Sequence, residues 1–225
     1  MISETPKFRL AIFASGGGSN ALKILEYFEQ HTAIEISLIL YNNKSAGVIQ
    51  HGLTFNVPTV YWNKTKMNDA KATLSMLNYY HVDGILLAGF LALIPKYLVD
   101  HFNRKILNIH PALLPDFGGH GMYGHFVHEA VSASGKLCSG ITIHLIDAEY
   151  DKGKILFQYP VSINANEDPV SIQKKVLALE HLYYAPIIEK YFMNPESLLL
   201  ELIEKNALLD CTIDIPNYSL FYLFI

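Results

Sequence analysis

An asparagine and a histidine share one face of a short apolar run that ends at a proline. In LNIHPALLP, residues 107–115, Asn108 and His110 are two residues apart, so in an extended strand both side chains project to the same side. An amide can donate a hydrogen bond to a developing negative charge, and an imidazole can move a proton near neutral pH. The alternative is a buried, hydrogen-bonded pair that supports the bend at Pro111. The spacing alone leaves both interpretations open.

A carboxylate further along the chain favours the catalytic interpretation. Asp151 lies in AEYDKGKI, between two later strand-like runs. A carboxylate beside an imidazole raises the pKa of the imidazole and fixes its orientation, as general acid–base chemistry requires, so we expect Asp151 to act on His110 in this way. His144 is a further polar residue in an apolar run, SGITIHLI, and we expect it to be a buried, hydrogen-bonded support.

Three consecutive glycines follow the first apolar run, in ASGGGSN, residues 14–20. Glycines let the backbone approach an anion closely, and the start of the next helix offers unpaired amides and a favourable dipole. A phosphate-binding loop is therefore predicted, with Ser19 or Asn20 capping the helix; its residues are Ser15, Gly16, Gly17, Gly18, Ser19 and Asn20. The structural alternative is a tight strand-to-helix turn. No Lys-Ser/Thr pair and no G-x-G-x-x-G spacing is present, which favours a phosphomonoester over a nucleoside triphosphate or a dinucleotide.

A metal site is the main rival hypothesis, because histidines are dense between residues 110 and 144. Five of the ten histidines lie there: His110, His120, His125, His128 and His144. No H-x-x-x-H or H-E-x-x-H pair on a helix occurs among them, and neither cysteine has metal-binding spacing. GGHGMYGH, residues 118–125, is expected to be a mobile loop whose histidines are solvated. We therefore expect no metal.

Short apolar runs alternate with helix-like segments through the first half of the chain. The expected strands are FRLAIFA (8–14), IEISLIL (34–40), PTVYW (58–62), DGILLAG (83–89) and KILNIH (105–110). The expected helices between the first four are 19–30, 44–53 and 66–80. Apolar runs with little alternation indicate strands covered on both faces, as in a parallel sheet with crossover helices.

The pattern changes after residue 110. SGITIHLI (139–146) and ILFQYPVSI (155–163) indicate an antiparallel pair, and 168–192 indicates one long helix with Asp168 as N-cap and Pro169 in its first turn. We predict an α/β fold: a mostly parallel, Rossmann-like open sheet with helices on both faces and an antiparallel strand pair near the C-terminal part. Ligands bind beyond the carboxyl ends of such strands, so the glycine loop and residues 108–110 are expected to border one crevice.

The bulk composition limits the class of partner. The 225 residues are 51% hydrophobic and 17% charged, as in a compact fold, and the formal charge of -4 gives no basic excess for nucleic acid. Two unpatterned cysteines suit a reduced cytoplasm, no signal peptide is recognised, and no apolar run is long enough to cross a membrane. A monomer or a homodimer is expected.

Several of these strings together resemble the glycinamide ribonucleotide formyltransferase family, within the folate-dependent formyltransferase superfamily. The resemblance covers about residues 7–192 and is carried by SGGGSN, LLAGF (86–90), ILNIHPALLP (106–115), GITIHLIDAEYDKGKI (140–155) and VLALEH (176–181). It implies one formyltransferase domain, 1–192, with a phosphate-binding half to about 100 and a folate and catalytic half beyond. Residues 193–225 would form a C-terminal tail of undetermined role, without the extra domains of the tRNA-modifying and deformylase relatives.

The resemblance implies transfer of a formyl group from 10-formyltetrahydrofolate to the amine of glycinamide ribonucleotide, without a metal. Asn108 would donate to the oxyanion, His110 would stabilise that charge and help to move a proton, and Asp151 would hold His110 and accept the amine proton. The loop at 15–20 would bind the substrate phosphate, and further substrate contacts would come from Leu91, Ile109, Pro111 and Glu180. The folate pocket would be lined by Leu87, Phe90, Leu93, Ile94, Ile146, Asp147 and Ala148, for which core packing is the alternative role.

Two positions depart from the family pattern. Ala92 stands where many members have an arginine at the folate rim, and Leu177 stands where many have a glutamine three residues before the glutamate. Both departures concern the affinity for the folate and for the acceptor substrate, and they leave Asn108, His110 and Asp151 unchanged. Two other functions stay open: formyl transfer to another amine, such as an amino sugar nucleotide, and a non-catalytic folate-binding role.

Overall fold

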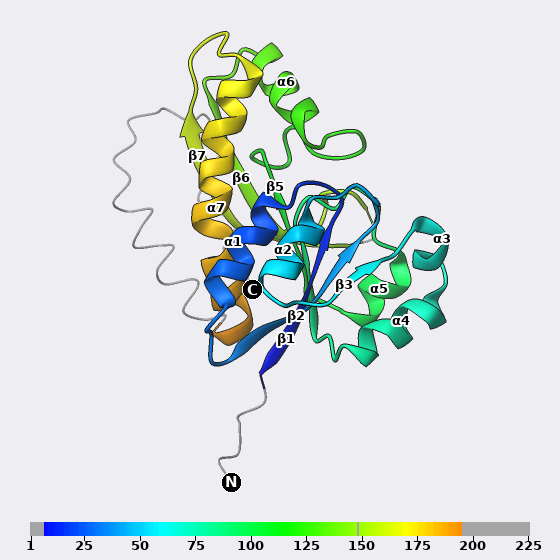
Figure 1. Ribbon diagram of the computed structural model, residues 1–225. Coiled ribbons are helices and arrows are strands. Elements are labelled where there is room, and N and C mark those ends of the chain that lie inside the picture. Colours follow the sequence, from blue (N-terminus) through cyan, green and yellow to red (C-terminus); the bar gives the residue numbers. More distant parts are fainter. Residues whose placement is uncertain (1–6, 148, 195–225) are drawn as a thin grey trace.

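Seven strands form one sheet in the order β3-β2-β1-β4-β5-β6-β7. The computed structural model describes residues 7–147 and 149–194 (Figure 1). The parallel part consists of β1 (Phe8–Ala14), β2 (Ile34–Tyr41), β3 (Thr59–Tyr61), β4 (Gly84–Leu87) and β5 (Ile106–His110). β6 (Cys138–Leu145) pairs antiparallel with β5 and with β7 (Ile155–Ser162). The predicted α/β fold with an added antiparallel pair is therefore confirmed.

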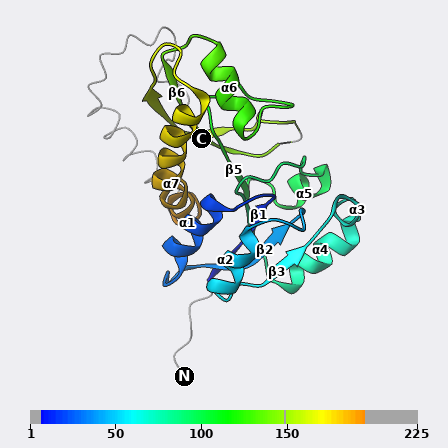
Figure 2. The same ribbon diagram turned by 45° about the horizontal axis from the view of Figure 1, so that its top comes forward.

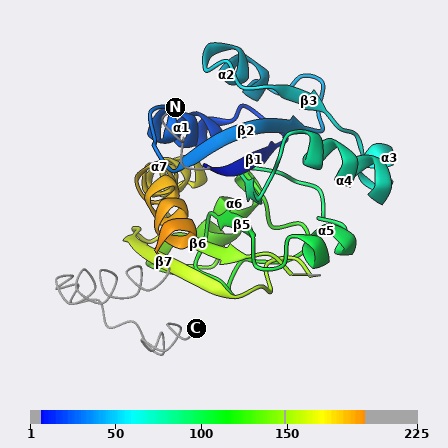
Figure 3. The same cartoon turned by 90° about the horizontal axis from the view of Figure 1, so that it is seen from below.

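Helices cover both faces of the sheet because the strands are apolar on both faces. Along β1, Leu10 and Ile12 belong to one core cluster, while Ala11 and Phe13 belong to the other. The first cluster includes residues of α1 (Ser19–Phe28), α2 (Val48–Thr54), α6 (His125–Ala133) and α7 (Pro169–Met193). The second includes residues of α3 (Lys64–Met67), α4 (Ala70–Tyr79) and α5 (Lys96–His101), and Figure 3 shows α4 and α5 on the other side of β1 and β2 from α1 and α7.

Helix α7 links the parallel part of the sheet near α1 to the antiparallel part near β6 and α6. It runs beside α1 and also contacts α6 and β6, as Figures 1 and 2 show. Its start is as predicted: the Asp168 side chain accepts a hydrogen bond from the Ser171 amide at 3.0 Å, and Pro169 is the first helical residue. The Tyr184 hydroxyl is buried 2.9 Å from the Leu87 carbonyl and 3.1 Å from that of Leu107, which fixes α7 over β4 and β5.

Several predicted helix boundaries are wrong, and side-chain capping explains one of them. The expected helix 66–80 is two helices, because Asn63 accepts from the Lys66 amide to begin α3 and Asp69 accepts from the Ala72 amide to begin α4. The expected helix 44–53 begins only at Val48. Helices α5 and α6 were not predicted. Helix α6 begins at His125, the last residue of the expected mobile loop.

The expected C-terminal tail lies outside the described residues apart from Met193 and Asn194. Within residues 7–147 and 149–194, no helix is both long and apolar enough to cross a membrane.

Candidate active site

A cavity of about 420 Å³ opens beyond the carboxyl ends of β4 and β5. The chain leaves β1 toward β2 and β3 and later returns to the other side of β1 as β4, so the strand order reverses at this point. Ligand crevices of open α/β sheets form where the order reverses in this way. The walls come from the start of α1, residues 89–94, the end of β5, the loop 119–124, residues 146–147 and 149–151, and α7.

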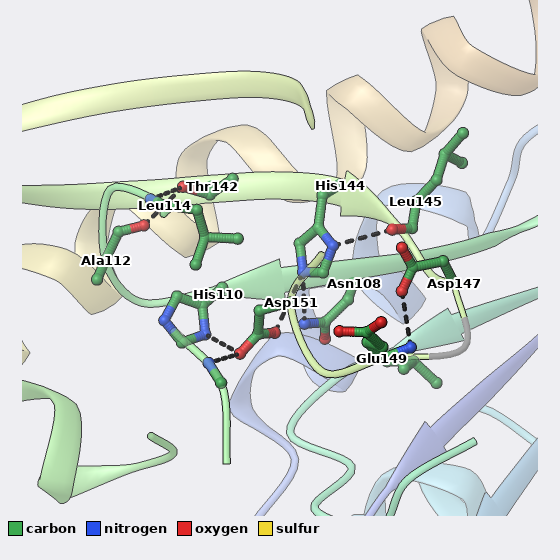
Figure 4. Close-up of polar contacts among 12 residues, drawn as sticks. Asn108, His110, Ala112, Leu114, Thr142, His144, Leu145, Asp147, Glu149 and Asp151 are labelled. Atoms are coloured by element: carbon green, nitrogen blue, oxygen red, sulfur yellow. Dashed lines mark hydrogen bonds and ion pairs between the residues drawn. The ribbon is translucent and has the colours of Figure 1, made fainter. Parts of the chain in front are cut away.

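Asn108, His110 and Asp151 line this cavity, and Figure 4 shows their side chains together with that of the fully buried His144. Asn108 Nδ2 lies 3.0 Å from His144 Nε2, its partner across the β5–β6 pair. One carboxylate oxygen of Asp151 lies 3.7 Å from His110 Nδ1, and the other lies 3.5 Å from His144 Nε2. The structure thus brings together the three residues that the sequence analysis proposed for catalysis, and it places beside them His144, which was expected to be a buried, hydrogen-bonded support.

Hydrogen bonds to carbonyl oxygens fix which ring nitrogens carry hydrogens. His110 Nε2 lies 2.8 Å from the Phe117 carbonyl, which can only accept, so Nε2 carries the hydrogen and Nδ1 faces Asp151 with a lone pair. By the same reasoning His144 donates from Nδ1 to the Leu145 carbonyl at 2.9 Å. Its Nε2 then accepts from Asn108, which leaves the second amide hydrogen of Asn108 for a ligand.

The pKa of His110 is shifted in the direction opposite to the expected one. Burial lowers the pKa of His110, and the neighbouring Asp151 carboxylate and Phe117 carbonyl raise it by less than burial lowers it. Asp151 therefore has the predicted effect, but the net pKa stays below 6.5 because the ring is almost fully buried. Burial alone would raise the pKa of Asp151, yet the neighbouring His144 and His110 side chains and the hydrogen bond from the Gly119 amide together lower it. At pH 7 the pair is a neutral imidazole beside a carboxylate.

Two glycines shape the turn that carries Asp151. Asp151 itself has a φ of 55°, a left-handed conformation that aspartate tolerates better than most residues. A Cβ on Gly118 would lie 2.4 Å from the Leu114 side chain and 3.3 Å from Asp151 Cβ, and one on Gly153 would lie 1.8 Å from the Leu145 carbonyl oxygen. Only glycine at 153 allows the Asp151 turn to approach β6 this closely, whereas a larger residue at 118 would have to displace the Leu114 side chain.

The glycine loop reaches the cavity at its helical end. Ser19 and Asn20 line the cavity, whereas Gly16 and Gly17 are exposed beside it. Gly18, with φ 79°, is the N-cap of α1, so the expected side-chain cap by Ser19 or Asn20 is wrong: both residues are already helical. The Ser15 hydroxyl accepts from the Leu91 amide at 3.0 Å and ties the loop to the segment after β4.

Glu180 lies across the cavity from β5, on the buried face of α7. Its carboxylate accepts a hydrogen bond from the Asn20 side-chain amide at 2.9 Å, which joins the glycine loop to α7. Burial raises the pKa of Glu180 to about 7, and the Asn20 hydrogen bond opposes that rise only in part. A carboxyl group that is about half protonated near neutral pH can accept from, or donate to, a bound hydroxyl or amine.

The expected folate residues form the apolar side of the cavity. Leu87, Phe90 and Ile94 are buried and also belong to the second core cluster, so for them the packing role and the lining role coexist. Leu91 and Leu93 are exposed by 51% and 45%, and they stand at the cavity rim. Of the other expected folate residues, Ile146 and Asp147 line the cavity, and Ala148 lies outside the described residues. Leu91, Ile109 and Pro111, which were expected to contact the acceptor substrate, line the cavity as well.

His128 is a cavity residue that the sequence analysis did not assign. It lies on α6, only 3% exposed, and burial followed by the nearby His110 and His125 lowers its pKa to about 4. Its Nδ1 has no hydrogen-bond partner among the described residues. The spacing of Val127, His128 and Val131 on one helix face could have indicated this burial. His120 lines the cavity as an exposed side chain, and the described residues contain no group of three His, Cys, Asp or Glu side chains arranged for a metal ion.

An amide, an imidazole and a carboxylate in a cavity at the switch point of an α/β sheet define a group-transfer type of site. The chain belongs to the formyl transferase family, whose model matches residues 8–188. It is 41% identical over 191 residues to the chloroplastic phosphoribosylglycinamide formyltransferase of Arabidopsis thaliana, which covers 82% of this chain and 65% of that protein. The chain thus spans just under two thirds of the length of that relative.

Bacterial relatives match over most of their own length. The phosphoribosylglycinamide formyltransferase of Bacillus subtilis is 31% identical over 189 residues, covering 81% of this chain and 93% of that protein. Among solved structures, phosphoribosylglycinamide formyltransferase from Bacillus halodurans superposes with a TM-score of 0.74 at 28% identity, covering 84% of this chain and 98% of that one.

Proposed function

We propose that this protein transfers the formyl group of 10-formyltetrahydrofolate to the primary amine of glycinamide ribonucleotide, a step of purine biosynthesis. The observation that carries the proposal is the placement of Asn108, His110 and Asp151 on the wall of the cavity that Asn20 and Glu180 also line. The named relatives, phosphoribosylglycinamide formyltransferases, support the same substrates.

The reaction needs a nucleophile, an oxyanion donor and a proton acceptor. The substrate amine attacks the formyl carbon, and the carbonyl oxygen gains negative charge beside the free amide hydrogen of Asn108. The amine proton leaves toward the His110–Asp151 pair, which is neutral imidazole and carboxylate at pH 7 and can therefore accept it. The resulting imidazolium, next to Asp151, stabilises the oxyanion. The bond from the formyl carbon to folate N10 then breaks as the oxyanion re-forms the carbonyl group, and N10 takes up the proton held by the imidazolium. The formyl amide and tetrahydrofolate leave, and His110 is neutral again.

The two ends of the cavity suit the two substrates. The glycine loop and Glu180 would hold the phosphate and the ribose or glycinamide end. Leu87, Phe90 and Ile94 would pack against the flat pterin ring, and residues 146–147 and 149–151 would contact its polar edge. Ala92 lines the rim without offering a charge, so the glutamate tail of the folate would depend on other residues.

A substrate panel tests this function. The full chain is incubated with 10-formyltetrahydrofolate and either glycinamide ribonucleotide, an amino sugar nucleotide or no amine, and the products are read by mass spectrometry. We expect N-formylglycinamide ribonucleotide to form and the amino sugar nucleotide to stay unmodified. Formylation of the amino sugar alone would reassign the acceptor, and folate binding without any transfer would indicate a non-catalytic protein. A cytoplasmic location and a monomeric or homodimeric state remain part of the proposal.

A further inference from the structure

Every carbonyl group of the triple-glycine loop has a protein donor. The Gly16 carbonyl accepts from the Val48 amide at 3.3 Å, and the Gly18 carbonyl accepts from the Leu22 amide at 2.8 Å. The Gly17 carbonyl lies 3.1 Å from Nε2 of His51, on α2. Because a carbonyl can only accept, Nε2 of His51 carries the hydrogen in this contact. Two of these three donors are backbone amides, and His51 is the one donor that is a side chain.

The amides of the same loop are unused. Within the part of the chain that the structure describes, the N–H groups of residues 17–20 donate to no protein acceptor. An anion is bound by such N–H groups and repelled by the partial negative charge of carbonyl oxygens. The loop can bind a phosphate only while its carbonyls stay turned away from the anion, so whatever holds the carbonyls also sets the phosphate affinity.

Close packing shows that α2 is built against this loop. A Cβ on Gly47 would lie 3.2 Å from Gly17 Cα and 3.3 Å from the Gly17 carbonyl oxygen, so only glycine lets the start of α2 approach this closely without the loop giving way. His51 is four residues after Gly47, which places both on the same side of the helix. The contacts of Gly47 and His51 with Gly17 therefore belong to one closely packed surface between α2 and the glycine loop.

We propose that His51 is a positioning residue for the phosphate of the acceptor substrate. It donates its Nε2 hydrogen to the Gly17 carbonyl and holds that peptide unit against α2, so that the amides of the loop face the phosphate. The inference depends on the proposed function, since it assigns a role at the phosphate end of the same cavity. His51 touches no reacting atom and leaves the formyl transfer step itself unchanged.

Four variants of the full chain test this role by steady-state kinetics. His51→Ala and His51→Asn remove the hydrogen bond, because the asparagine amide is one bond too short. His51→Gln restores a donor at about the reach of imidazole Nε2, and His101→Ala on α5 is the control for loss of an exposed histidine. Loss of one hydrogen bond should raise KM for glycinamide ribonucleotide about three- to tenfold in the first two variants. We expect kcat and the KM for folate to stay within about twofold, and His51→Gln to recover most of the affinity.

The dephosphorylated acceptor, glycinamide riboside, separates positioning from general damage. With it, wild type and His51→Ala should have equal kcat/KM, since no phosphate is present to be held. The inference would be overturned if His51→Ala left the KM for the ribonucleotide unchanged. It would also be overturned if His51→Ala lowered kcat/KM for the riboside as much as for the ribonucleotide. Binding of inorganic phosphate, followed by ³¹P NMR in the same variants, keeps the two proposals apart: weaker binding in His51→Ala would support the role of His51 even if wild type failed to formylate the ribonucleotide.

Discussion

Asn108 and His144 face each other across the antiparallel β5–β6 pair, with 3.0 Å between Nδ2 of the amide and Nε2 of the imidazole. His144 is fully buried and its other nitrogen is held by the Leu145 carbonyl, so its ring cannot turn away. The contact fixes the rotation of the Asn108 amide and keeps one N–H available to the cavity. In the proposed mechanism His144 thereby orients the oxyanion donor, while His110 and Asp151 accept the amine proton.

Asn108→Ala should impair the chemical step more than binding. Loss of one preorganised oxyanion donor typically lowers kcat about 10²–10³-fold, and we expect KM for both substrates to change by less than about threefold. Steady-state formyl transfer measures this, with Asn78→Ala on the exposed side of α4 as the matched control. A kcat for Asn108→Ala close to that of wild type would remove Asn108 from the mechanism.

His110 should titrate below 6.5, and lower still when Asp151 is replaced. The carboxylate stabilises the protonated ring, so Asp151→Asn removes a contribution that raises the pKa of His110 and leaves burial to lower it further. NMR titration of the His110 ring protons measures both values. Asp100→Asn, in an exposed pair with Lys96, is the control and should not move them. A His110 pKa at or above 6.5 in wild type, or a rise in Asp151→Asn, is incompatible with the proposed proton acceptor.

Glu180→Gln should stabilise the protein at alkaline pH. The pKa of Glu180 is about 7 in the folded protein, above the 4.5 of an exposed glutamate. The buried acid form therefore stabilises the fold fully below about pH 4.5, and this contribution is lost as the pH rises through 7. Glutamine stays neutral and still accepts from Asn20, so at pH 8 the variant should gain about 1–3 kcal/mol in unfolding free energy.

Urea unfolding at pH 4.5 and pH 8 measures this difference. We expect the gain at pH 8 and almost none at pH 4.5, together with a raised KM for the ribonucleotide. An equal effect at both pH values would show that the carboxyl group is not the buried, raised-pKa group described above.

Gly18→Ala should destabilise the loop at the start of α1, whereas Gly16→Ala should not. Gly18 has a φ of 79°, and an added Cβ would lie 2.8 Å from the Val48 side chain, while a Cβ on Gly16 meets nothing within 4 Å. A left-handed alanine costs about 1–2 kcal/mol before the contact with Val48 is counted. Denaturant unfolding of the two variants gives the comparison, and equal stabilities would be inconsistent with the conformation of this loop.

The sheet could be predicted because its strands are continuous apolar runs covered on both faces. The same runs indicated that Asn108 and His110 lie at a strand end, whereas the association of Asp151 with them depended on its place between two later strands and on the family resemblance. The two-residue period of a strand also predicts that both side chains lie on one face.

Other features depend on tertiary contacts that the sequence does not display. The net pKa of His110 follows from its burial, which outweighs the neighbouring carboxylate. The glycine that caps α1 is recognised only by its left-handed φ, and the role of His51 depends on the approach of α2 to the loop. His128 was not assigned to the site because no helix was predicted over residues 125–133, where it lies on the buried side of α6.

The most direct test of the account is a crystal structure of the protein with glycinamide ribonucleotide and a folate analogue that lacks the formyl group. We predict that the phosphate lies on the amides of residues 17–20, that the substrate amine faces Asn108, His110 and Asp151, and that folate N10 is next to it. A phosphate bound away from the glycine loop, or an amine out of reach of Asn108 and Asp151, would contradict it.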